Sequence, residues 1–386
     1  MHYEIFRVST DVADAWIIGE KGSYDYAYGG TRKMAPDVDD DTVEEELFGL
    51  MHYESHFKNC LINQAITDGA LDGFNGELPE GFMNSRIGGG RCLFRPKNKA
   101  IDEILSDPAH EDFGGVIKVL FQDVGSLLNK KDGRIKLTPD FGKFAGVSDI
   151  LGVFTPHVLG IRCEDGGCGG KASYTSTGII MALETFGIDF YKDKPVTLIG
   201  SDGALGTDIT NYFLTNSYGN TKVCDIAYEE DDIRFSEVPD PIEALPANWG
   251  MFTDHCLQRG GVIVTTTVGN ELENSNWRIL PENTLLVLAH NLALPRGEDG
   301  RTLAYEIENR NITLIPGQIL TLGGALTSRL EWFSRKNGIR DFDKQLAHRI
   351  VGAMVTFLLG KVTDISEEIP GETMYEKMAS YAQFEL

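Results

Sequence analysis

The sequence carries little positive charge and lacks a long apolar run. Lysine and arginine total 35 against 58 aspartate and glutamate residues, which gives a net charge of −23. Such a surface repels phosphate backbones and anionic lipid, so we expect neither a nucleic acid nor a membrane as partner. No stretch approaches the roughly 20 apolar residues that span a bilayer, and the first residues do not read as a signal peptide. We therefore expect a cytoplasmic protein that acts on a small molecule.

The cysteines do not form a recognisable framework. Six are present, and no two of them make a CxxC pair. Cys163 and Cys168 flank a glycine-rich loop that could hold a metal ion or a disulfide, but free thiols are the usual state in the cytoplasm. His52 and His56 are four residues apart without the remaining features of a helical metal motif. We expect no metal site.

A chain of 386 residues is too long for one ordinary core, so we expect two domains. From about residue 172, short apolar strands alternate with helical segments, which predicts a parallel sheet covered on both faces. The predicted fold is α/β, with a first domain over 1–170 and a doubly wound Rossmann-type domain over 171–340. We expect helices over 340–386 to pack back on the first domain, and residues 60–85 to be a polar insertion rather than a core element.

A glycine-rich turn lies between a predicted strand and a predicted helix. The turn matches the dinucleotide-binding pattern GxGxxG, except that serine replaces the first glycine. The candidate cofactor-binding residues of this turn are Ser201, Asp202, Gly203, Ala204, Leu205 and Gly206. Asp225 ends the next predicted strand, where an acid accepts hydrogen bonds from a ribose. Further acidic residues follow it and would repel a 2′-phosphate, so we expect NAD rather than NADP. Alternatively, the turn is structural, or it binds another nucleotide.

Seven segments in order resemble motifs of the Glu/Leu/Phe/Val amino-acid dehydrogenases, closest to the leucine and phenylalanine branch. The resemblance covers nearly the whole chain and places a dimerisation and substrate domain before the NAD-binding domain, with a cleft between them. The segments are Tyr28–Arg32, Leu50–Glu54, Ile87–Arg91, Thr138–Gly142, Tyr174–Gly178, Ala289–Asn291 and Pro316–Gly324.

The resemblance implies roles for several residues. Thr175 and Asn291 would lie near the nicotinamide, and Tyr28, Gly29 and Gly30 would lie beside the substrate. It also implies a homodimer or larger homo-oligomer. The family reaction is the reversible oxidative deamination of an L-amino acid to a 2-oxo acid and ammonia.

Two lysines of the family are replaced. One holds the substrate carboxylate and the other activates water, and in this chain their positions read Glu54 and Arg91. A carboxylate repels an anion and would suit an amine or a guanidinium instead. The pKa of arginine lies above about 12, so Arg91 offers essentially no neutral base near neutral pH. It could still clamp a carboxylate or polarise an imine. Lys58, one helical turn after Glu54, could stand in for a lost lysine.

Other positions near the expected site keep or change the family pattern. Asp140 matches the catalytic aspartate and could pass a proton, although it could also only cap a turn. Thr321 stands where the family has asparagine, and we expect it to contact the substrate. An extra segment at about 57–85 separates the two replaced lysines and could reshape the substrate pocket. Glu54 could be a solvated helix residue, and Arg91 a surface ion-pair partner.

These substitutions favour a NAD-dependent oxidoreductase that acts on an amine or imine C–N bond, or a neighbouring bond, of an atypical amino-acid-derived substrate. Hydride transfer needs mainly the placement of cofactor and substrate, and reduction of an imine needs only a proton donor. Two alternatives stay open. One is a non-redox condensation or cyclisation enzyme, and the other is a catalytically silent nucleotide-binding protein.

Overall fold

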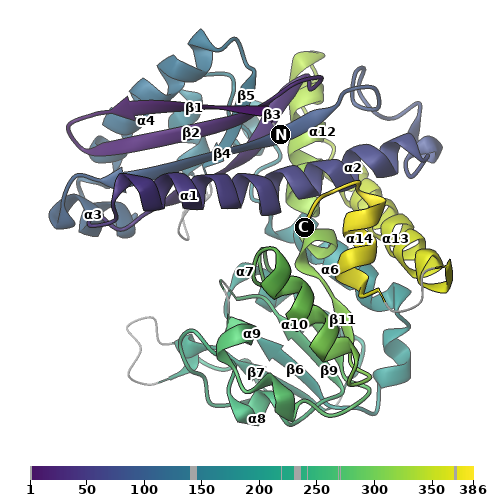
Figure 1. Ribbon diagram of the computed structural model, residues 1–386. Coiled ribbons are helices and arrows are strands. Elements are labelled where there is room, and N and C mark those ends of the chain that lie inside the picture. Colours follow the sequence, from purple (N-terminus) through teal and green to yellow (C-terminus); the bar gives the residue numbers. More distant parts are fainter. Residues whose placement is uncertain are drawn as a thin grey trace. The chain divides into compact units, whose positions relative to one another are not determined.

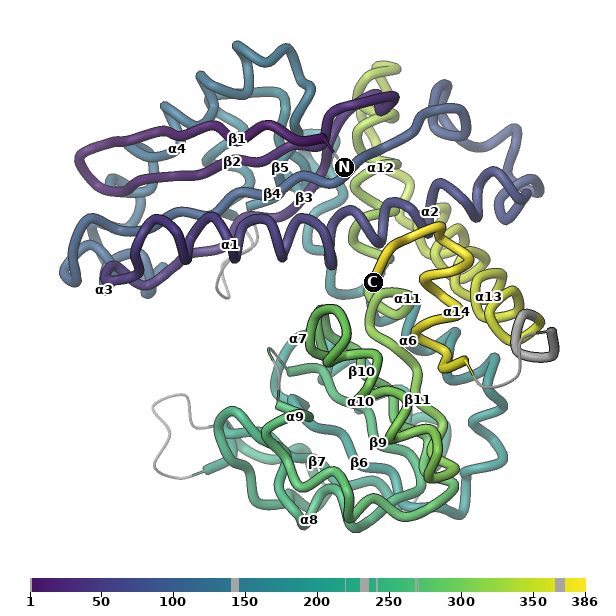
Figure 2. The backbone as a smooth tube through the Cα atoms, viewed as in Figure 1, coloured from purple at the N-terminus to yellow at the C-terminus, as the bar shows by residue number. Residues whose placement is uncertain are grey.

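The computed structural model describes residues 2–139, 146–218, 220–229, 236–240, 242–267, 269, 271–368 and 372–386. The chain divides into two compact units, which Figures 1 and 2 trace from purple to yellow. Unit 1 comprises Met1–Ile66, Phe74–Lys171 and Ala325–Ala347. Unit 2 comprises Thr67–Gly73, Ala172–Gly324 and His348–Leu386.

Unit 1 is built on a mixed five-stranded sheet with the strand order β1-β2-β4-β3-β5. The β1–β2 and β2–β4 pairs are antiparallel, whereas β3 runs parallel to both β4 and β5. The strands are β1 (His2–Ser9), β2 (Ala13–Lys21), β3 (Tyr26–Lys33), β4 (Ile87–Pro96) and β5 (Ile135–Pro139).

Helices cover this sheet, and strand alternation decides what each face carries. Cys92 and Phe94 of β4 join the apolar core formed with α3, α4 and α5. Arg91 and Leu93 therefore point to the opposite face, where α1 runs along the sheet (Figure 1). The helices that lie wholly or mostly in unit 1 are α1 (Asp40–Leu50), η1 (Met51–His56), α2 (Phe57–Thr67), α3 (Lys99–Ser106), α4 (Phe113–Lys130), α5 (Val147–Gly152), η3 (Cys163–Asp165) and α12 (Gly323–Lys336). The short helix η2 (Asp72–Phe74) crosses the boundary between the two units along the chain.

The helix that begins at Asp40 continues far beyond one element. Asp39 caps α1 by accepting a hydrogen bond from the Thr42 backbone N–H at 2.8 Å, and acidic residues fill the first turn, as the helix dipole favours. The helix then passes through the π-helical turn η1 and continues as α2. Such π-turns shift the helix face and occur often at functional sites. This one carries Glu54 and His56.

Unit 2 contains a six-stranded parallel sheet with the order β11-β10-β9-β6-β7-β8. Counted along the chain, this is the strand order of a doubly wound dinucleotide-binding sheet. The predicted parallel sheet of short strands that alternate with helices is confirmed. The strands are β6 (Val196–Ile199), β7 (Thr221–Cys224), β8 (Glu243–Ala244), β9 (Val262–Thr265), β10 (Leu285–Leu288) and β11 (Thr313–Ile315).

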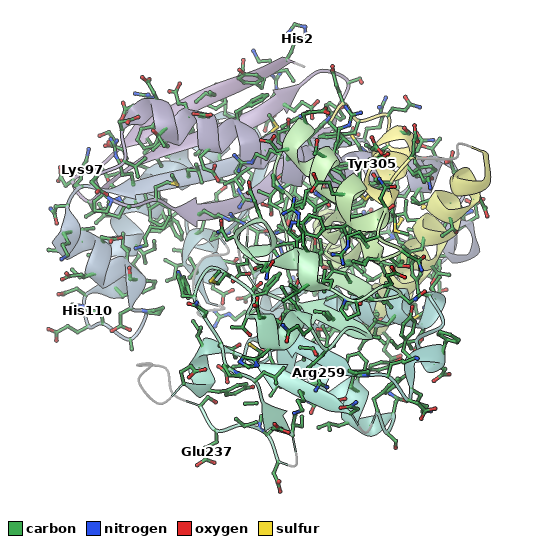
Figure 3. All side chains as sticks on the ribbon, turned by 60° about the horizontal axis from the view of Figure 1, so that its bottom comes forward. His2, Lys97, His110, Glu237, Arg259 and Tyr305 are labelled. Atoms are coloured by element: carbon green, nitrogen blue, oxygen red, sulfur yellow. The ribbon has the colours of Figure 1, made fainter. Side chains whose placement is uncertain are left out.

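The helices of unit 2 connect and cover these strands. Arg259, labelled in Figure 3, donates to the Thr197 hydroxyl at 2.9 Å and to the Asn220 carbonyl at 2.8 Å, which ties β6 to the turn before β7. The helices are α6 (Ala172–Thr185), η4 (Ile188–Tyr191), α7 (Ala204–Thr215), η5 (Ile226–Tyr228), α8 (Asp254–Leu257), α9 (Glu271–Asn274), η6 (Trp277–Ile279), α10 (Glu298–Glu308), α11 (Gly317–Leu320), α13 (Lys344–Glu368) and α14 (Met374–Tyr381).

The C-terminal helices differ from the expectation that 340–386 would pack on the first domain. Residues 348–386 belong to unit 2, and the segment that rejoins unit 1 is 325–347. Helix α13 packs on α6, where Gly178 lets the side chains of Val351 and Val355 approach. Thr177 and His348 also share a hydrogen bond of 2.7 Å. By length and composition, residues 344–364 would suffice to cross a membrane, contrary to our expectation, but half of this stretch is buried.

The segment 60–85 is not the polar insertion that its composition predicted. Its first part completes α2, and apolar side chains along it are buried in the protein, among them Leu61, Ile62, Ala65, Leu71 and Phe82. The Phe82 carbonyl also accepts hydrogen bonds from Arg329 of α12. The segment is therefore part of the core, because the helical spacing of its first apolar residues gives α2 a continuous buried face.

Candidate active site

A buried ion pair joins Glu54 and Arg91, the two residues that we expect at the positions of the family's lysines. The Arg91 guanidinium lies 3.1 Å from one Glu54 oxygen, and Arg32 lies 3.5 Å from the other. The side chains of Glu54 and Arg91 are only 9% and 5% exposed, whereas that of Arg32 is 42% exposed. The interpretations of Glu54 as a solvated helix residue and of Arg91 as a surface partner are therefore both wrong.

The charge state of this pair follows from its surroundings. Burial would raise the pKa of the Glu54 carboxyl, but neighbouring positive charges outweigh burial and lower it to about 2. The largest of these effects comes from Arg91, followed by Lys58 and Arg32. Glu54 is thus a carboxylate near neutral pH, and Arg91 faces a full negative charge. A guanidinium held in this way cannot act as a base.

Glycines make the room for Arg91. A side chain at Gly30 would begin 3.1 Å from the Arg91 Nη1 atom, and one at Gly29 would collide with the Gly90 carbonyl at 1.5 Å. Both glycines therefore serve the close approach of β3 to β4. The Arg91 Nε atom is buried and has no hydrogen-bond partner within the part of the chain that the structure describes. It is a donor that a ligand atom could satisfy.

Lys58 lies at the start of α2 and is 6% exposed. Its charge acts on Glu54 strongly enough to lower the pKa of that carboxyl. The structure thus brings Lys58 near the Glu54–Arg91 pair, as the helical spacing predicted. Burial of a lysine beside a charged pair is typical of functional sites.

A second polar cluster surrounds the hydroxyl of Tyr28. This oxygen lies 3.0 Å from the Thr138 hydroxyl, 2.7 Å from the Ser328 hydroxyl and 2.8 Å from the Lys171 ammonium. Lys171 also donates to Thr138 at 2.6 Å. Neither Ser328 nor Lys171 was predicted from the sequence. Lys171 could have been singled out from the sequence, because it directly follows the glycine-rich run 166–170.

Another lysine, Lys136 of β5, was also missed. It is 3% exposed and lies over the rings of Tyr26 and Trp332 at 4.2 and 3.8 Å. Burial, assisted by two nearby cations, lowers the pKa of Lys136 to about 7. The candidate proton carrier Asp140 lies outside the described residues.

The glycine-rich turn of unit 2 is tightly packed where Gly200 and Gly206 meet and open at Gly203. Gly200 has φ +85°, and a side chain at Gly206 would collide with the Gly200 carbonyl at 2.2 Å. A side chain at Gly203 would meet only that carbonyl, at 3.5 Å. Gly203 precedes α7 without a side-chain cap, and Gly203 and Ala204 are exposed, whereas Leu205 is half-buried. The turn thus leaves space at the helix N-terminus, as a cradle for a pyrophosphate does.

Asp225 follows β7 directly and holds the turn in place. One of its oxygens accepts from the Asp202 backbone N–H at 3.0 Å, and the other accepts from the Ala227 N–H at 3.0 Å. Ser201 donates to the Tyr228 hydroxyl at 3.1 Å. The structure therefore brings the predicted turn and the predicted acid together at the carboxyl ends of β6 and β7.

Two of the remaining expected site residues follow strands of this sheet: Asn291, expected at the nicotinamide, comes after β10, and Thr321, expected at the substrate, comes after β11 and α11. The Thr321 hydroxyl donates to the Asn291 side-chain oxygen at 2.8 Å. A side chain at Gly323 would lie 3.1 Å from the Cα atom of Thr175. His290, which we had not singled out, is 6% exposed, and neither ring nitrogen has a hydrogen-bond partner among the described residues. Burial lowers the pKa of His290 to about 4, so it is neutral near pH 7.

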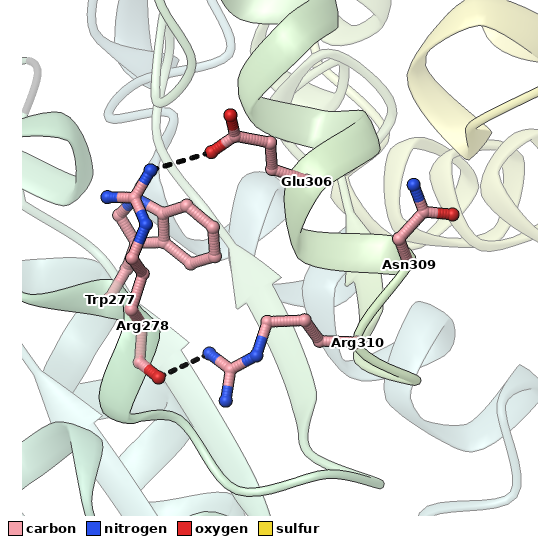
Figure 4. A pocket seen from close by; sticks show the side chains of 5 residues that line it. All are labelled: Trp277, Arg278, Glu306, Asn309 and Arg310. Carbon is pink, nitrogen blue, oxygen red and sulfur yellow. Dashed lines mark hydrogen bonds and ion pairs between the residues drawn. The ribbon is translucent and has the colours of Figure 1, made fainter.

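A surface pocket in unit 2 lies elsewhere. Figure 4 shows its lining, in which Arg278 pairs with Glu306 at 2.8 Å. Its residues Trp277, Arg278, Asn309 and Arg310 precede β10 and β11. The pocket is therefore at the amino ends of these strands, whereas ligands of such sheets bind at the carboxyl ends.

Comparison with known proteins gives a clear result only at the level of structure. No family model matches the chain, and no curated protein matches its sequence. The structure is similar to that of L-tryptophan dehydrogenase from Nostoc punctiforme, at 14% identity and a TM-score of 0.61, over 99% of this chain and 94% of that one.

Two glutamate dehydrogenases are also similar. The enzyme from Peptoniphilus asaccharolyticus gives 16% identity and a TM-score of 0.57, over 99% of this chain and 88% of that one. The enzyme from Plasmodium falciparum gives 13% identity and a TM-score of 0.62, over 99% and 80%. The chain therefore has the fold of the amino-acid dehydrogenases.

Proposed function

We propose that the protein is a NAD-dependent oxidoreductase that acts on an amine or imine C–N bond of an amino-acid-derived substrate and does not hydrolyse the imine. The observation that carries this proposal is the buried Glu54–Arg91 pair. Hydrolysis needs a base whose pKa lies near the working pH. The protonated Arg91, held by a carboxylate, does not meet that need.

The glycine-rich turn fits a dinucleotide. Gly203 offers open space where a side chain would otherwise stand, and the start of α7 has N–H groups without a side-chain cap. These groups, together with Ser201, would hold the pyrophosphate. When bound, a nicotinamide dinucleotide supplies or accepts the hydride. Thr175 and Asn291 would lie at its nicotinamide end, and Thr321, which hydrogen-bonds Asn291, would lie at the substrate.

The groups of unit 1 would bind the substrate and move its proton. Arg91 would place its unused Nε donor on an anionic or carbonyl oxygen of the substrate, and the buried Lys58 would add a second positive charge. Lys171 and Tyr28 would donate hydrogen bonds to a polar substrate group. We propose Asp140 as the proton carrier.

Further parts of the proposal concern the cofactor type and the assembly. Asp225 would repel a 2′-phosphate, so we propose NAD rather than NADP. We also propose that the protein works in the cytoplasm as a homodimer or larger homo-oligomer.

A test of this proposal follows NADH by its absorbance with a panel of imines, 2-oxo acids with ammonia, and amines. We expect NADH oxidation with at least one imine and none with an oxo acid alone. The Gly203→Ala variant serves as the control, because it keeps the fold while it fills the cofactor cradle. If no compound oxidises NADH and NADH does not bind, the redox proposal is wrong.

A further inference from the structure

A histidine at the carboxyl end of β10 is buried without a hydrogen bond from its ring. His290 is 6% exposed, and neither its Nδ1 nor its Nε2 atom has a hydrogen-bond partner within the part of the chain that the structure describes. A buried polar atom of this kind destabilises a fold, because it has lost its contact with water without a replacement. Such atoms are rare in proteins, and two of them on one ring call for a binding partner.

The ring of His290 is neutral and can both donate and accept. Burial lowers the pKa of His290 to about 4, so the imidazole carries no charge near neutral pH. One ring nitrogen then bears a hydrogen and donates, while the other nitrogen accepts. A neutral imidazole suits uncharged polar groups such as amides and hydroxyls, whereas a phosphate or a carboxylate is better held by a cation.

The backbone around His290 is closely packed. A side chain at Gly317 would begin 2.0 Å from the His290 carbonyl oxygen, so the start of α11 packs directly against this backbone. The next residue, Asn291, accepts a hydrogen bond of 2.8 Å from the Thr321 hydroxyl. His290 is thus held in place through the backbone, while its two ring nitrogens stay unpaired.

Further unpaired atoms follow the neighbouring strand. β9 and β10 are adjacent parallel strands of the sheet (Figure 2), and Thr265 is the last residue of β9. The Oγ1 atom of Thr265 is buried and has no hydrogen-bond partner among the described residues. The same holds for the Oε2 atom of Glu271, at the start of α9. The segments at the carboxyl ends of β9 and β10 therefore carry polar atoms that the described part of the protein does not satisfy.

The order of the strands assigns this region to one half of a dinucleotide. β7 and β8 lie on one side of β6, and β9, β10 and β11 lie on the other side. In sheets of this order each half binds one mononucleotide, and the dinucleotide crosses between them where the order reverses. The glycine-rich turn follows β6 and Asp225 follows β7, so the first half would take the adenosine. The second half, which contains β9 and β10, is left for the nicotinamide and its ribose, which carry an amide and hydroxyls.

We propose that His290 anchors the nicotinamide half of the cofactor. One ring nitrogen donates to an oxygen of that half, and the other accepts from its amide or from a hydroxyl. Binding thus supplies the hydrogen bonds that the protein alone leaves unmade. This inference rests on the proposed function, because it requires that the glycine-rich turn hold a dinucleotide.

The test uses the full chain with two probes, NADH and ADP. ADP carries the adenosine and the pyrophosphate but lacks the nicotinamide half, and isothermal titration calorimetry gives both dissociation constants. We expect His290→Leu to weaken NADH binding at least about tenfold, because two hydrogen bonds are lost, and to change ADP binding less than about twofold. His290→Gln keeps a donor and an acceptor, so it should recover part of the loss.

A buried unpaired ring predicts a second effect, which needs no ligand. The melting temperature of ligand-free His290→Leu should equal or exceed that of the wild type, because the unsatisfied atoms are removed. Thr210→Val is the matched control. The Thr210 Oγ1 atom is also buried without a partner among the described residues, but it lies in the interior of α7. This variant should not lower the melting temperature, and its affinities for both probes should match those of the wild type.

A third measurement uses no substitution at His290. In wild-type protein labelled with 15N at histidine, the imidazole with the lowest pKa should change its NMR signal on addition of NADH and not on addition of ADP. An imidazole that does not respond to NADH overturns the inference. An unchanged NADH affinity of His290→Leu, or an equal loss of affinity for NADH and ADP, also overturns it. If the wild type binds neither probe, the proposed function itself fails, which is a distinct result.

Discussion

The Glu54 carboxylate and the Arg91 guanidinium lie 3.1 Å apart, and both are buried in unit 1. Each neutralises the other in a place where water is largely excluded. Breaking such a pair on one side leaves an uncompensated charge, which costs more than the pair itself contributes. The pair therefore keeps Glu54 as a carboxylate and holds the Arg91 guanidinium in place, which limits the chemistry open to this site.

The first prediction concerns stability. Glu54→Gln leaves the Arg91 guanidinium buried without its carboxylate, so we expect the free energy of unfolding to fall by about 3–5 kcal/mol. Adding Arg91→Met should restore most of this loss, because the unpaired charge is then removed. Urea unfolding of the three proteins measures both effects. Equal stability of wild type and Glu54→Gln would show that the pair is not closed in solution.

The second prediction concerns acid. The pKa of Glu54 is about 2 in the folded chain and 4.5 as its ordinary value, so the stabilisation is present above pH 4.5 and is lost as the pH falls through 2. It amounts to about 3 kcal/mol. The stability difference between wild type and Glu54→Gln should therefore shrink across this range. Unfolding free energies of both proteins, measured at several pH values, check this prediction. A stability difference between them that stays constant from pH 4.5 to 2 contradicts it.

The strands of unit 2 were predictable because a parallel sheet buries both of its faces. Its strands, such as 196–199 and 285–288, are then buried along their whole length and almost entirely apolar. The glycine-rich turn was predictable for a similar reason, since Gly200 and Gly206 are required by backbone geometry. Local pattern alone is sufficient for such elements.

The ion pair between Glu54 and Arg91 could not be predicted from the local sequence pattern. It depends on the π-turn η1, which sets the face that Glu54 presents, and on the register of β3 and β4. The core role of 60–85 was missed because its second half is rich in glycine, although Phe82 is buried. The assignment of residues 348–386 to unit 2 was not predicted, because the apolar face of a helix does not indicate which of two units it packs against.

The third prediction compares two glycines of the same turn. Gly203→Ala should keep the wild-type melting temperature, because its side chain would meet only one atom at 3.5 Å. It should weaken NADH binding at least about tenfold, since the backbone must approach the pyrophosphate closely. Gly206→Ala should instead destabilise unit 2, because its side chain would lie 2.2 Å from the Gly200 carbonyl. Thermal unfolding and fluorescence titration with NADH separate the two, and an unchanged affinity of Gly203→Ala would place the cofactor elsewhere.

The fourth prediction concerns cofactor choice. Asp225 presents a negative charge at the end of β7, so NADH should bind at least about tenfold more tightly than NADPH. Asp225→Asn removes the charge and keeps one acceptor oxygen for the Asp202 N–H, while the bond from the Ala227 N–H is lost. It should narrow the ratio of the NADH and NADPH dissociation constants. Titration of both proteins with both nucleotides gives the ratios. A ratio that does not change on substitution would mean that Asp225 only supports the turn.

The central claim is that a paired Arg91 cannot activate water against an imine. The most direct measurement incubates the wild-type protein with NAD⁺ and a panel of L-amino acids and quantifies the ammonia and 2-oxo acid released. A leucine dehydrogenase and the Glu54→Lys/Arg91→Lys variant are assayed beside it. We predict release by the wild type at least about 100-fold slower than by the leucine dehydrogenase. Release of both products at comparable rates would contradict the account.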